Sequence, residues 1–181
     1  MANNQHYIDL YKKNKWEALC LDIEVIEFGG SISLVGMYIP KPGLIESECF
    51  IRGKNLTFNE MKPLIDNAKI IITFNGLRFD IPKINKEFPG LIPKDKKVLD
   101  LFRFACSLNM PYKLRTLENT FGIERLTSES ERKGVAIKLW NQYKKGDIEA
   151  LFKLKEYNRQ DTINLYFLAE KLIKHAESKS Q

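Results

Sequence analysis

Four acidic side chains and a tyrosine fall into three short segments of this chain, and Leu, Ile, Val or Phe residues lie in or beside each segment. The segments are Leu21-Asp22-Ile23-Glu24, Asn75-Gly76-Leu77-Arg78-Phe79-Asp80 and Tyr157-Asn158-Arg159-Gln160-Asp161. A carboxylate among Leu, Ile and Phe is costly unless an opposite charge compensates it, and divalent cations commonly do so. We therefore expect a metal-dependent reaction, and cleavage of nucleic acid is the chemistry that such carboxylates suit best.

The first segment indicates the end of a buried strand over residues 16–25. Alternate residues of a strand share a face, so Asp22 and Glu24 point to the same side of the sheet. Two like charges at this separation repel each other and raise one pKa unless a cation lies between them. The pattern therefore indicates a metal seat, although a strand that turns a polar face to water would have the same sequence.

The third segment lies in a helix that we expect over residues 147–174. Asp161 falls in the middle of its apolar stripe, which is formed by Leu154, Tyr157, Leu165, Leu168 and Leu172. A carboxylate directed toward the core must meet a basic side chain, a hydrogen-bond network or a metal. Tyr157 lies one turn earlier on the same face and places a phenol beside Asp161. A buried Tyr-Asp hydrogen bond or an ion pair is the structural alternative to a metal site.

The second segment admits two interpretations of its aspartate. Asp80 precedes Ile81-Pro82, and an Asp before a proline in the first helical turn is a favourable N-cap. Gly76 permits a tight loop after the preceding strand, and loops at the carboxyl ends of such strands bind ligands. This position favours Asp80 as a metal ligand. Asp100 precedes a later apolar helix, and we assign it to capping or to support of the site.

Local patterns predict the elements that must position these residues. Strands are expected at residues 16–25, 32–39, 44–51, 69–74 and around Val98, with a turn at 28–31. Helices are expected from 57 to about 66, after a loop at 75–78, and at 101–108, 114–121, 135–145 and 147–174, with a surface loop at 124–134. An antiparallel meander followed by alternating helices and strands predicts an α/β fold: a mixed five-stranded sheet flanked by helices, as in the ribonuclease H-like fold.

Length and charge limit the class of protein. A chain of 181 residues can bury one sizeable core, so we expect one domain at residues 16–176, after a polar lead at 1–15 and before a frayed tail at 177–181. There are 29 Lys and Arg against 23 Asp and Glu, a net charge of +6. Because carboxylates are concentrated at one site, the remaining surface must be basic, which suits a polyanionic partner.

Cysteine spacing and hydropathy bear on the compartment. Cys20, Cys49 and Cys106 are odd in number and widely spaced, which indicates reduced thiols rather than a disulfide framework or a zinc site. No apolar run approaches the length needed to cross a bilayer. We expect a soluble cytoplasmic protein that has no membrane partner.

Together, the three segments resemble the exonuclease motifs of the DnaQ-like superfamily, or DEDD exonucleases, which share the ribonuclease H-like fold. The resemblance spans about residues 19–172. Tyr157, four residues before Asp161, is similar to the tyrosine of the DEDDy branch. The second motif resembles that of the proofreading domain of family B DNA polymerases. The small size resembles that of stand-alone ribonuclease H-like exonucleases of the YprB type.

The resemblance implies a 3′-to-5′ exonuclease that uses two Mg²⁺ or Mn²⁺ ions. Asp22 would bridge both ions, Glu24 and Asp161 would complete the site of the ion that activates water, and Asp80 would hold the other ion through water. Tyr157 would orient the attacking water. Two metals about 3.5–4 Å apart stabilise the attacking and leaving oxygens of an in-line displacement. The product would be a 5′-nucleoside monophosphate.

The expected partners are the 3′ ends of single-stranded DNA, with RNA 3′ ends as the alternative, because discrimination depends on how the site meets the 2′-hydroxyl. A non-catalytic nucleic-acid-binding module would lack one of the carboxylates, and none is missing here. Since no polymerase, helicase or RNA-binding appendage is evident in the sequence, targeting is expected to come either from the domain's own surface or from a protein partner. The residues expected to contact nucleic acid are Asn75, Leu77, Arg78, Lys113 and Arg159.

Overall fold

The computed structural model describes residues 4–41, 47–125 and 134–179. Five strands form one sheet in the order β3-β2-β1-β4-β5. Antiparallel pairs join β1 to β2 and β2 to β3, whereas β1, β4 and β5 run parallel. This arrangement confirms the predicted α/β fold with a mixed sheet. The strands are β1 (Ala18–Val25), β2 (Ile32–Tyr38), β3 (Ser47–Ile51), β4 (Ile70–Thr73) and β5 (Lys97–Asp100).

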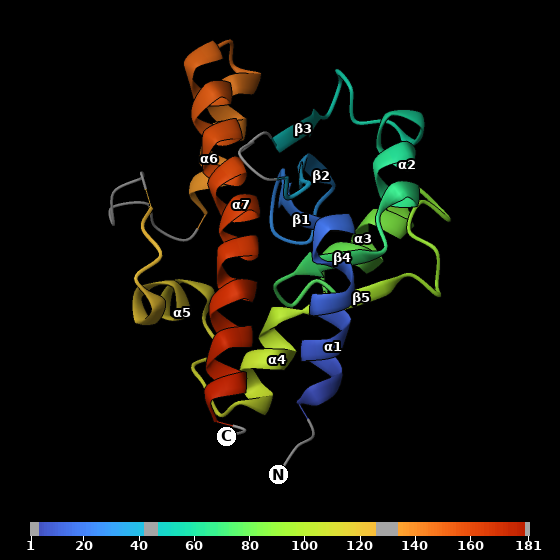
Figure 1. The fold of residues 1–181 in the computed structure, drawn as a ribbon. Helices are drawn as coiled ribbons and strands as arrows, with labels where there is room; N and C mark the ends of the chain where they lie inside the picture. Colours follow the sequence, from blue (N-terminus) through green and yellow to red (C-terminus); the bar gives the residue numbers. More distant parts are fainter. Residues whose placement is uncertain (1–3, 42–46, 126–133, 180–181) are drawn as a thin grey trace.

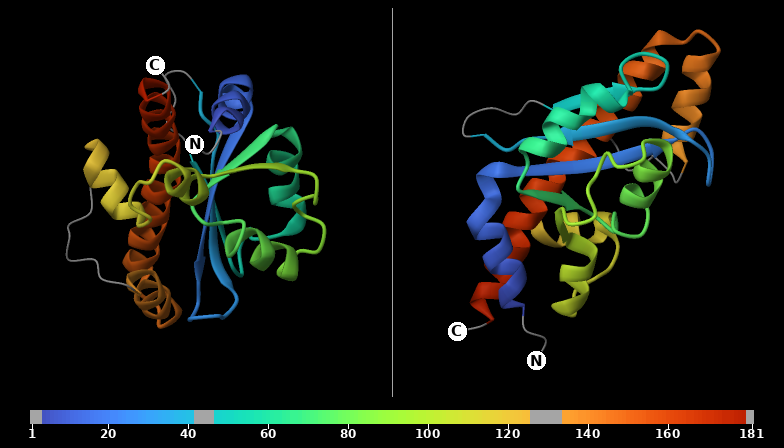
Figure 2. Two further views of the ribbon diagram at one scale, coloured as in Figure 1. Left: turned by 90° about the horizontal axis from the view of Figure 1, so that it is seen from below. Right: turned by 90° about the vertical axis from the view of Figure 1, so that its right-hand side faces the viewer.

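Helices cover both faces of the sheet, as Figures 1 and 2 show. One face carries α2 (Phe58–Asn67) and α3 (Asp80–Glu87). The long helix α7 (Ile148–Ser178) crosses the other face, and the remaining helices pack around it. These are α1 (Gln5–Asn14), α4 (Leu101–Ser107), α5 (Leu114–Phe121) and α6 (Val135–Lys144), with a short 3-10 turn, η1 (Lys15–Glu17), after α1.

The predicted elements are present, with bounds that shift by a few residues. The expected cap of α2 is formed, because the Thr57 side chain accepts a hydrogen bond from the Glu60 amide. Asp147 caps α7 in the same way through the Ala150 amide, at 3.1 Å. Parts of two predicted segments lie outside the described residues: residues 44–46 of the third strand and residues 126–133 of the loop.

The N-terminal segment forms a helix that the sequence patterns did not predict. Ile8 and Tyr11 of α1 are buried, and the Tyr11 hydroxyl donates a hydrogen bond to Glu170 of α7. Two apolar residues three positions apart on a helix share a face. That small face is enough to dock an otherwise polar segment. At the other end of the chain, α7 continues through Ser178, into the predicted tail.

Two further predictions concern cysteines and membranes. Cys20, Cys49 and Cys106 are free thiols, as expected. Among the helices of the described residues, none has both the length and the apolar character that a membrane span requires.

Polar residues separate two apolar clusters on the sheet face that α7 covers. The first cluster includes Cys20, Tyr38 and Leu165, and the second includes Leu34 and Leu154. Between these residues, each of the three central elements carries polar residues or glycine. They are Asp22 and Glu24 on β1, Gly36 on β2, and Asn158 and Asp161 on α7.

Candidate active site

The gap between the two apolar clusters contains three of the predicted carboxylates. Asp22 and Glu24 share one face of β1, and α7 brings Asp161 over that face. One ligand oxygen from each residue lies within 4.8 Å of the other two. Residues of the first and third motifs, far apart in sequence, therefore form one cluster of hard oxygen ligands of the kind that Mg²⁺ and Mn²⁺ favour.

Asp80 lies close enough to this cluster for its charge to raise the pKa values of Asp22 and Glu24. It is the first residue of α3 and is buried, and its carboxylate accepts hydrogen bonds from its own amide and from that of Ile23 on β1. The alternative role as an N-cap does not apply, because Phe79 occupies the cap position and no side chain caps this helix. The hydrogen bond from the Ile23 amide instead directs the Asp80 carboxylate toward β1, the strand that carries Asp22 and Glu24.

Burial, and then neighbouring acidic groups, raise the pKa values of all four carboxyl groups. Burial, followed by the charges of Glu24, Asp161 and Asp80, raises the pKa of Asp22 well above its usual range. Burial and neighbouring carboxylates raise the pKa of Glu24 to about 8. Burial likewise raises the pKa of Asp80 to about 7 and that of Asp161 to about 6. Near neutral pH the cluster therefore retains protons that a divalent cation would displace.

Asp100 supports the loop of the second motif. Its Oδ1 accepts hydrogen bonds from the Asn75 amide at 2.8 Å and the Phe102 amide at 3.1 Å, and its Oδ2 accepts one from the Leu77 amide at 3.2 Å. The predicted capping and supporting roles are both present. By holding the loop that precedes α3, Asp100 sets the position at which Asp80 enters the helix.

Gly76 makes this loop possible. A Cβ at this position would lie 2.1 Å from Thr73 Oγ1, closer than any side chain tolerates. The preceding residue, Asn75, has a φ of 60°, in the left-handed region that Asn adopts more readily than most residues. The dipeptide therefore lets the chain turn tightly over the end of β4.

Asn158 is a site residue that the sequence patterns did not single out. Its side chain is fully buried, and Nδ2 donates a hydrogen bond to Asp22 Oδ2 at 2.8 Å. The Asn158 side chain also lowers the pKa of Glu24, which partly offsets the rise caused by burial and by the neighbouring carboxylates. Two signals pointed to this position: Asn158 lies three residues before Asp161, on the same helix face, and Gly36 interrupts an apolar strand.

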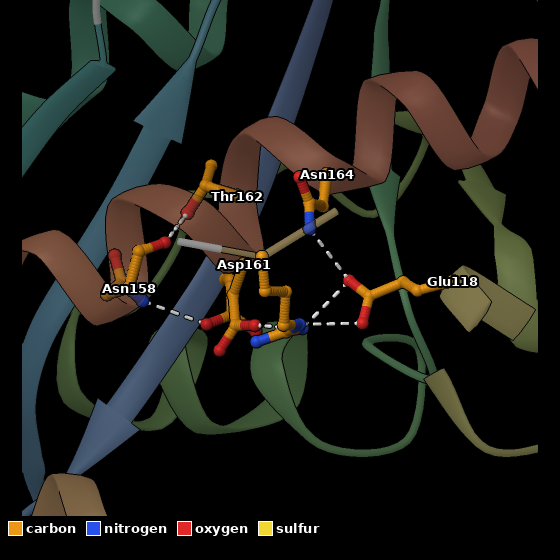
Figure 3. A network of polar contacts seen from close by, with 7 residues as sticks. Glu118, Asn158, Asp161, Thr162 and Asn164 are labelled. Carbon is orange, nitrogen blue, oxygen red and sulfur yellow. Dashed lines mark hydrogen bonds and ion pairs between the residues drawn. The ribbon is translucent and has the colours of Figure 1, made fainter. Parts of the chain in front are cut away.

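Arg125 also belongs to the site, although it falls in the segment predicted to be a surface loop. Its Nη2 lies 2.5 Å from Asp161 Oδ1, and its Nε and Nη2 form two hydrogen bonds with Glu118, of 2.7 and 2.8 Å. Asn164 Nδ2 donates a further hydrogen bond to Glu118 at 3.0 Å. Figure 3 shows Glu118, Asp161 and Asn164 of this network. No local sequence signal distinguishes Arg125 from the other charged residues of its segment.

Tyr157 lies one turn before Asp161, as predicted, and is half-buried against the Leu34 and Leu154 cluster. Burial and the charges of Asp161, Glu24 and Asp22 raise its pKa, so its phenol remains protonated and can donate a hydrogen bond. The ion pair proposed as the structural alternative for Asp161 does exist, but it is formed with Arg125.

A pocket of about 410 Å³ opens beside Asp22 and Asp80. Two exposed aromatic side chains, Phe28 at 75% and Phe79 at 65% exposure, line it together with Phe74 and Lys83. Lys83 Nζ donates hydrogen bonds to the carbonyls of Gly29 and Gly30, which ties α3 to the turn between β1 and β2. The pocket thus combines acidic groups at one side with aromatic surfaces at its opening.

The predicted nucleic-acid contacts fall in different places. Asn75, Leu77 and Arg78 share the loop that leads to Asp80, and Arg78 is exposed there. Lys113 is exposed just before α5.

Arg159 pairs with Glu156 through hydrogen bonds of 2.8 and 2.9 Å. It lines a separate pocket of about 280 Å³ with Cys49 and Phe152. The structure therefore does not bring Arg159 to the carboxylate cluster.

Comparison with known proteins matches the part of the chain that carries the four carboxylates. No curated protein matches the sequence. A family model described as the RNase_H superfamily matches residues 19–173, an interval that includes Asp22, Glu24, Asp80 and Asp161. Members of this superfamily are generally nucleases that use divalent metals. The chain, with its five-stranded mixed sheet and its acidic cluster, belongs to the RNase_H superfamily.

Proposed function

We propose that this protein is a DEDDy-type 3′-to-5′ exonuclease that hydrolyses single-stranded DNA and releases 5′-nucleoside monophosphates. The observation that carries the proposal is the convergence of Asp22, Glu24 and Asp161 within 4.8 Å. Asp80 faces them from the start of α3. An active site at the carboxyl ends of parallel strands is also where α/β sheets usually bind ligands.

The carboxylates suit a pair of Mg²⁺ or Mn²⁺ ions. Asp22, Glu24 and Asp161 would hold one ion, and Asp22 and Asp80 would hold the other. The raised pKa values support this assignment, because burial and nearby acidic groups disfavour the ionised carboxylates unless positive charge is added. Bound there, such ions would lower the pKa of a water molecule and neutralise charge on the phosphate.

The chain's own side chains would bind and orient the substrate. Phe28 and Phe79 present exposed rings at the pocket, where a terminal base can stack on them. Arg78 is exposed next to Phe79 and can follow a phosphate, and Lys113 is a further candidate farther along the chain. The Tyr157 hydroxyl would donate a hydrogen bond to the attacking water near Asp161.

The proposal is tested with single-stranded and duplex DNA and RNA, each labelled at the 5′ or the 3′ end. The protein is incubated with each in Mg²⁺, Mn²⁺ or EDTA. We expect immediate release of a labelled mononucleotide from 3′-labelled single-stranded DNA, a shortening ladder from 5′-labelled DNA, and no reaction in EDTA. Faster trimming of RNA would identify an exoribonuclease instead. Binding without cleavage in every metal would identify a non-catalytic module.

A further inference from the structure

We infer that Asn158 positions the carboxylates that would bind the metal ions, and that the absence of a side chain at Gly36 leaves room for the Asn158 amide. The inference rests on the proposed function, because it assigns Asn158 a role toward the ions that Asp22 and Glu24 would hold. The amide acts through these carboxylates rather than on the substrate.

Hydrogen bonding gives the first argument. Asn158 Nδ2 donates a hydrogen bond to Asp22 Oδ2 at 2.8 Å. A ligand oxygen of Glu24 lies within 4.8 Å of one of Asp22. One neutral donor therefore fixes a member of a pair of carboxylates that otherwise repel each other. Residues that hold metal ligands in this way fix the directions of their lone pairs, and their removal typically weakens metal affinity about 10- to 100-fold.

The other end of the same amide gives the second argument. Asn158 Oδ1 is buried and has no hydrogen-bond partner among the described residues. An unpaired buried acceptor destabilises a fold, so an apolar side chain would be preferred here if packing alone decided the residue. The orientation that leaves Oδ1 unpaired is the one that turns Nδ2 toward Asp22. The same amide orientation therefore leaves Oδ1 unpaired, which is unfavourable, and keeps the Nδ2 donor on the Asp22 carboxylate.

The position of Gly36 gives the third argument. Gly36 on β2 is the register partner of Asp22 on β1. A Cβ at Gly36 would lie 1.9 Å from Asn158 Oδ1 and 2.5 Å from Thr162 Oγ1. Any larger residue would therefore push the amide away from its place above Asp22. Figure 3 shows Asn158, Asp161 and Thr162 together on α7 at this point.

The test measures Mn²⁺ affinity of the whole protein without nucleic acid, by calorimetry, together with its melting temperature. Asn158→Ala should weaken Mn²⁺ binding about 10- to 100-fold while the protein stays folded. Thr162→Val is the matched control, because Thr162 is equally buried on the same helix and donates only to the Asn158 backbone carbonyl, at 2.7 Å. Its Mn²⁺ affinity should equal that of the wild type. Unchanged affinity in Asn158→Ala, or equal weakening in Thr162→Val, overturns the inference.

Gly36→Ala approaches the same amide from the neighbouring strand. It should also weaken Mn²⁺ binding, but it should add little in the Asn158→Ala background, where the amide that it displaces is gone. Additive losses would show that Gly36 acts independently and would overturn its assigned role. If Gly36→Ala does not fold, the comparison of Asn158→Ala with Thr162→Val still decides the role of the amide.

The same measurements separate this inference from the proposed function. If the wild type binds Mn²⁺ and Asn158→Ala weakens that binding, the positioning role is supported even when no DNA or RNA substrate is cleaved, in which case the exonuclease proposal alone fails. If the wild type does not bind Mn²⁺, or binds it no better than Asp22→Asn does, the inference is overturned together with the metal site.

Discussion

Two charged regions lie side by side along α7. One gathers like charges, whereas the other pairs opposite charges. In the carboxylate cluster, Asp22, Glu24 and Asp161 lie close together, and the Asn158 amide donates a hydrogen bond to Asp22. In the adjacent pair, one buried acid, Glu118, receives two hydrogen bonds from Arg125 and a third from Asn164. Asp161 belongs to both regions, since it lies in the cluster and contacts Arg125.

The difference between the regions indicates what each is for. A buried charge whose partners are all present holds elements together. Here Glu118 of α5 is joined to α7 through Asn164, and Arg125 links Glu118 to Asp161 of α7. A group of like charges with too few partners destabilises the fold and persists only if something else selects it. Mutations should therefore have opposite consequences: removing a charge from the cluster should abolish function and spare stability, whereas removing one from the pair should destabilise the protein.

The largest effect is expected for Asp22→Asn. The proposed metal chemistry supplies several kcal/mol of transition-state stabilisation, so the rate of nuclease cleavage should fall by at least about 1000-fold. The melting temperature without metal should stay the same or rise, because one of the repelling charges is removed. Single-turnover cleavage rates and thermal melts in EDTA measure the two effects. An active variant, or one that is strongly destabilised, would contradict the contrast between the regions.

The next effect is the loss of stability in Arg125→Met. This substitution leaves Glu118 buried without its charged partner, which typically destabilises a protein by about 3–5 kcal/mol. Arg103→Met is the matched control, since Arg103 is exposed on α4, and surface substitutions usually change stability by less than about 0.5 kcal/mol. Urea denaturation of both variants measures the difference. Equal stability of the two would show that the Glu118 and Arg125 pair does not hold α5 in place.

Tyr157→Phe should have a smaller effect, confined to the rate. The ring is retained against Leu34 and Leu154 while the hydroxyl is removed, so turnover should fall by about 10- to 1000-fold with little change in melting temperature. Tyr157→Ala serves as the packing control and should also lower stability by leaving a cavity. If Tyr157→Phe cleaves at the wild-type rate, the tyrosine has only a packing role.

The smallest effect is a slope of stability with pH in the metal-free protein. The pKa of Glu24 rises from 4.5 to about 8, that of Asp80 from 3.8 to about 7, and that of Asp161 from 3.8 to about 6. The folded state therefore binds more protons than the unfolded state between about pH 4 and 8, and stability should fall as pH rises through this window.

Melting temperatures in EDTA and in Mn²⁺ test this slope. Mn²⁺ should raise the melting temperature most near pH 8, where the carboxylates are ionised in the folded state and bind the cation best. Asp22→Asn should show both a flatter slope and a smaller Mn²⁺ shift than the wild type. A melting temperature that increases from pH 5 to pH 8 in EDTA would contradict the assignment.

Much of the fold follows from local sequence patterns, as do the carboxylates and the tyrosine of the site. Strand alternation places Asp22 and Glu24 on one face, and helical periodicity places Tyr157 and Asp161 on another, because these relations depend only on neighbouring residues. The strands and helices follow from the same periodicities, and the antiparallel meander with its crossovers limits how they can assemble into a sheet. The structure also has the predicted tight loop at Gly76 before Asp80, and Asp100 supports that loop as predicted.

Only the tertiary structure decided which partners the carboxylates meet. Asn158 and Asp22 are separated by 136 positions in the chain, and no local period links them. Arg125 lies in a polar segment and becomes a buried ion pair only because α5 and α7 converge there. Conversely, Arg159 sits within the third motif but turns to Glu156, three residues away on its own helix. Side-chain periodicity sets the face on which a residue lies, whereas the packing of distant elements sets what that face encounters.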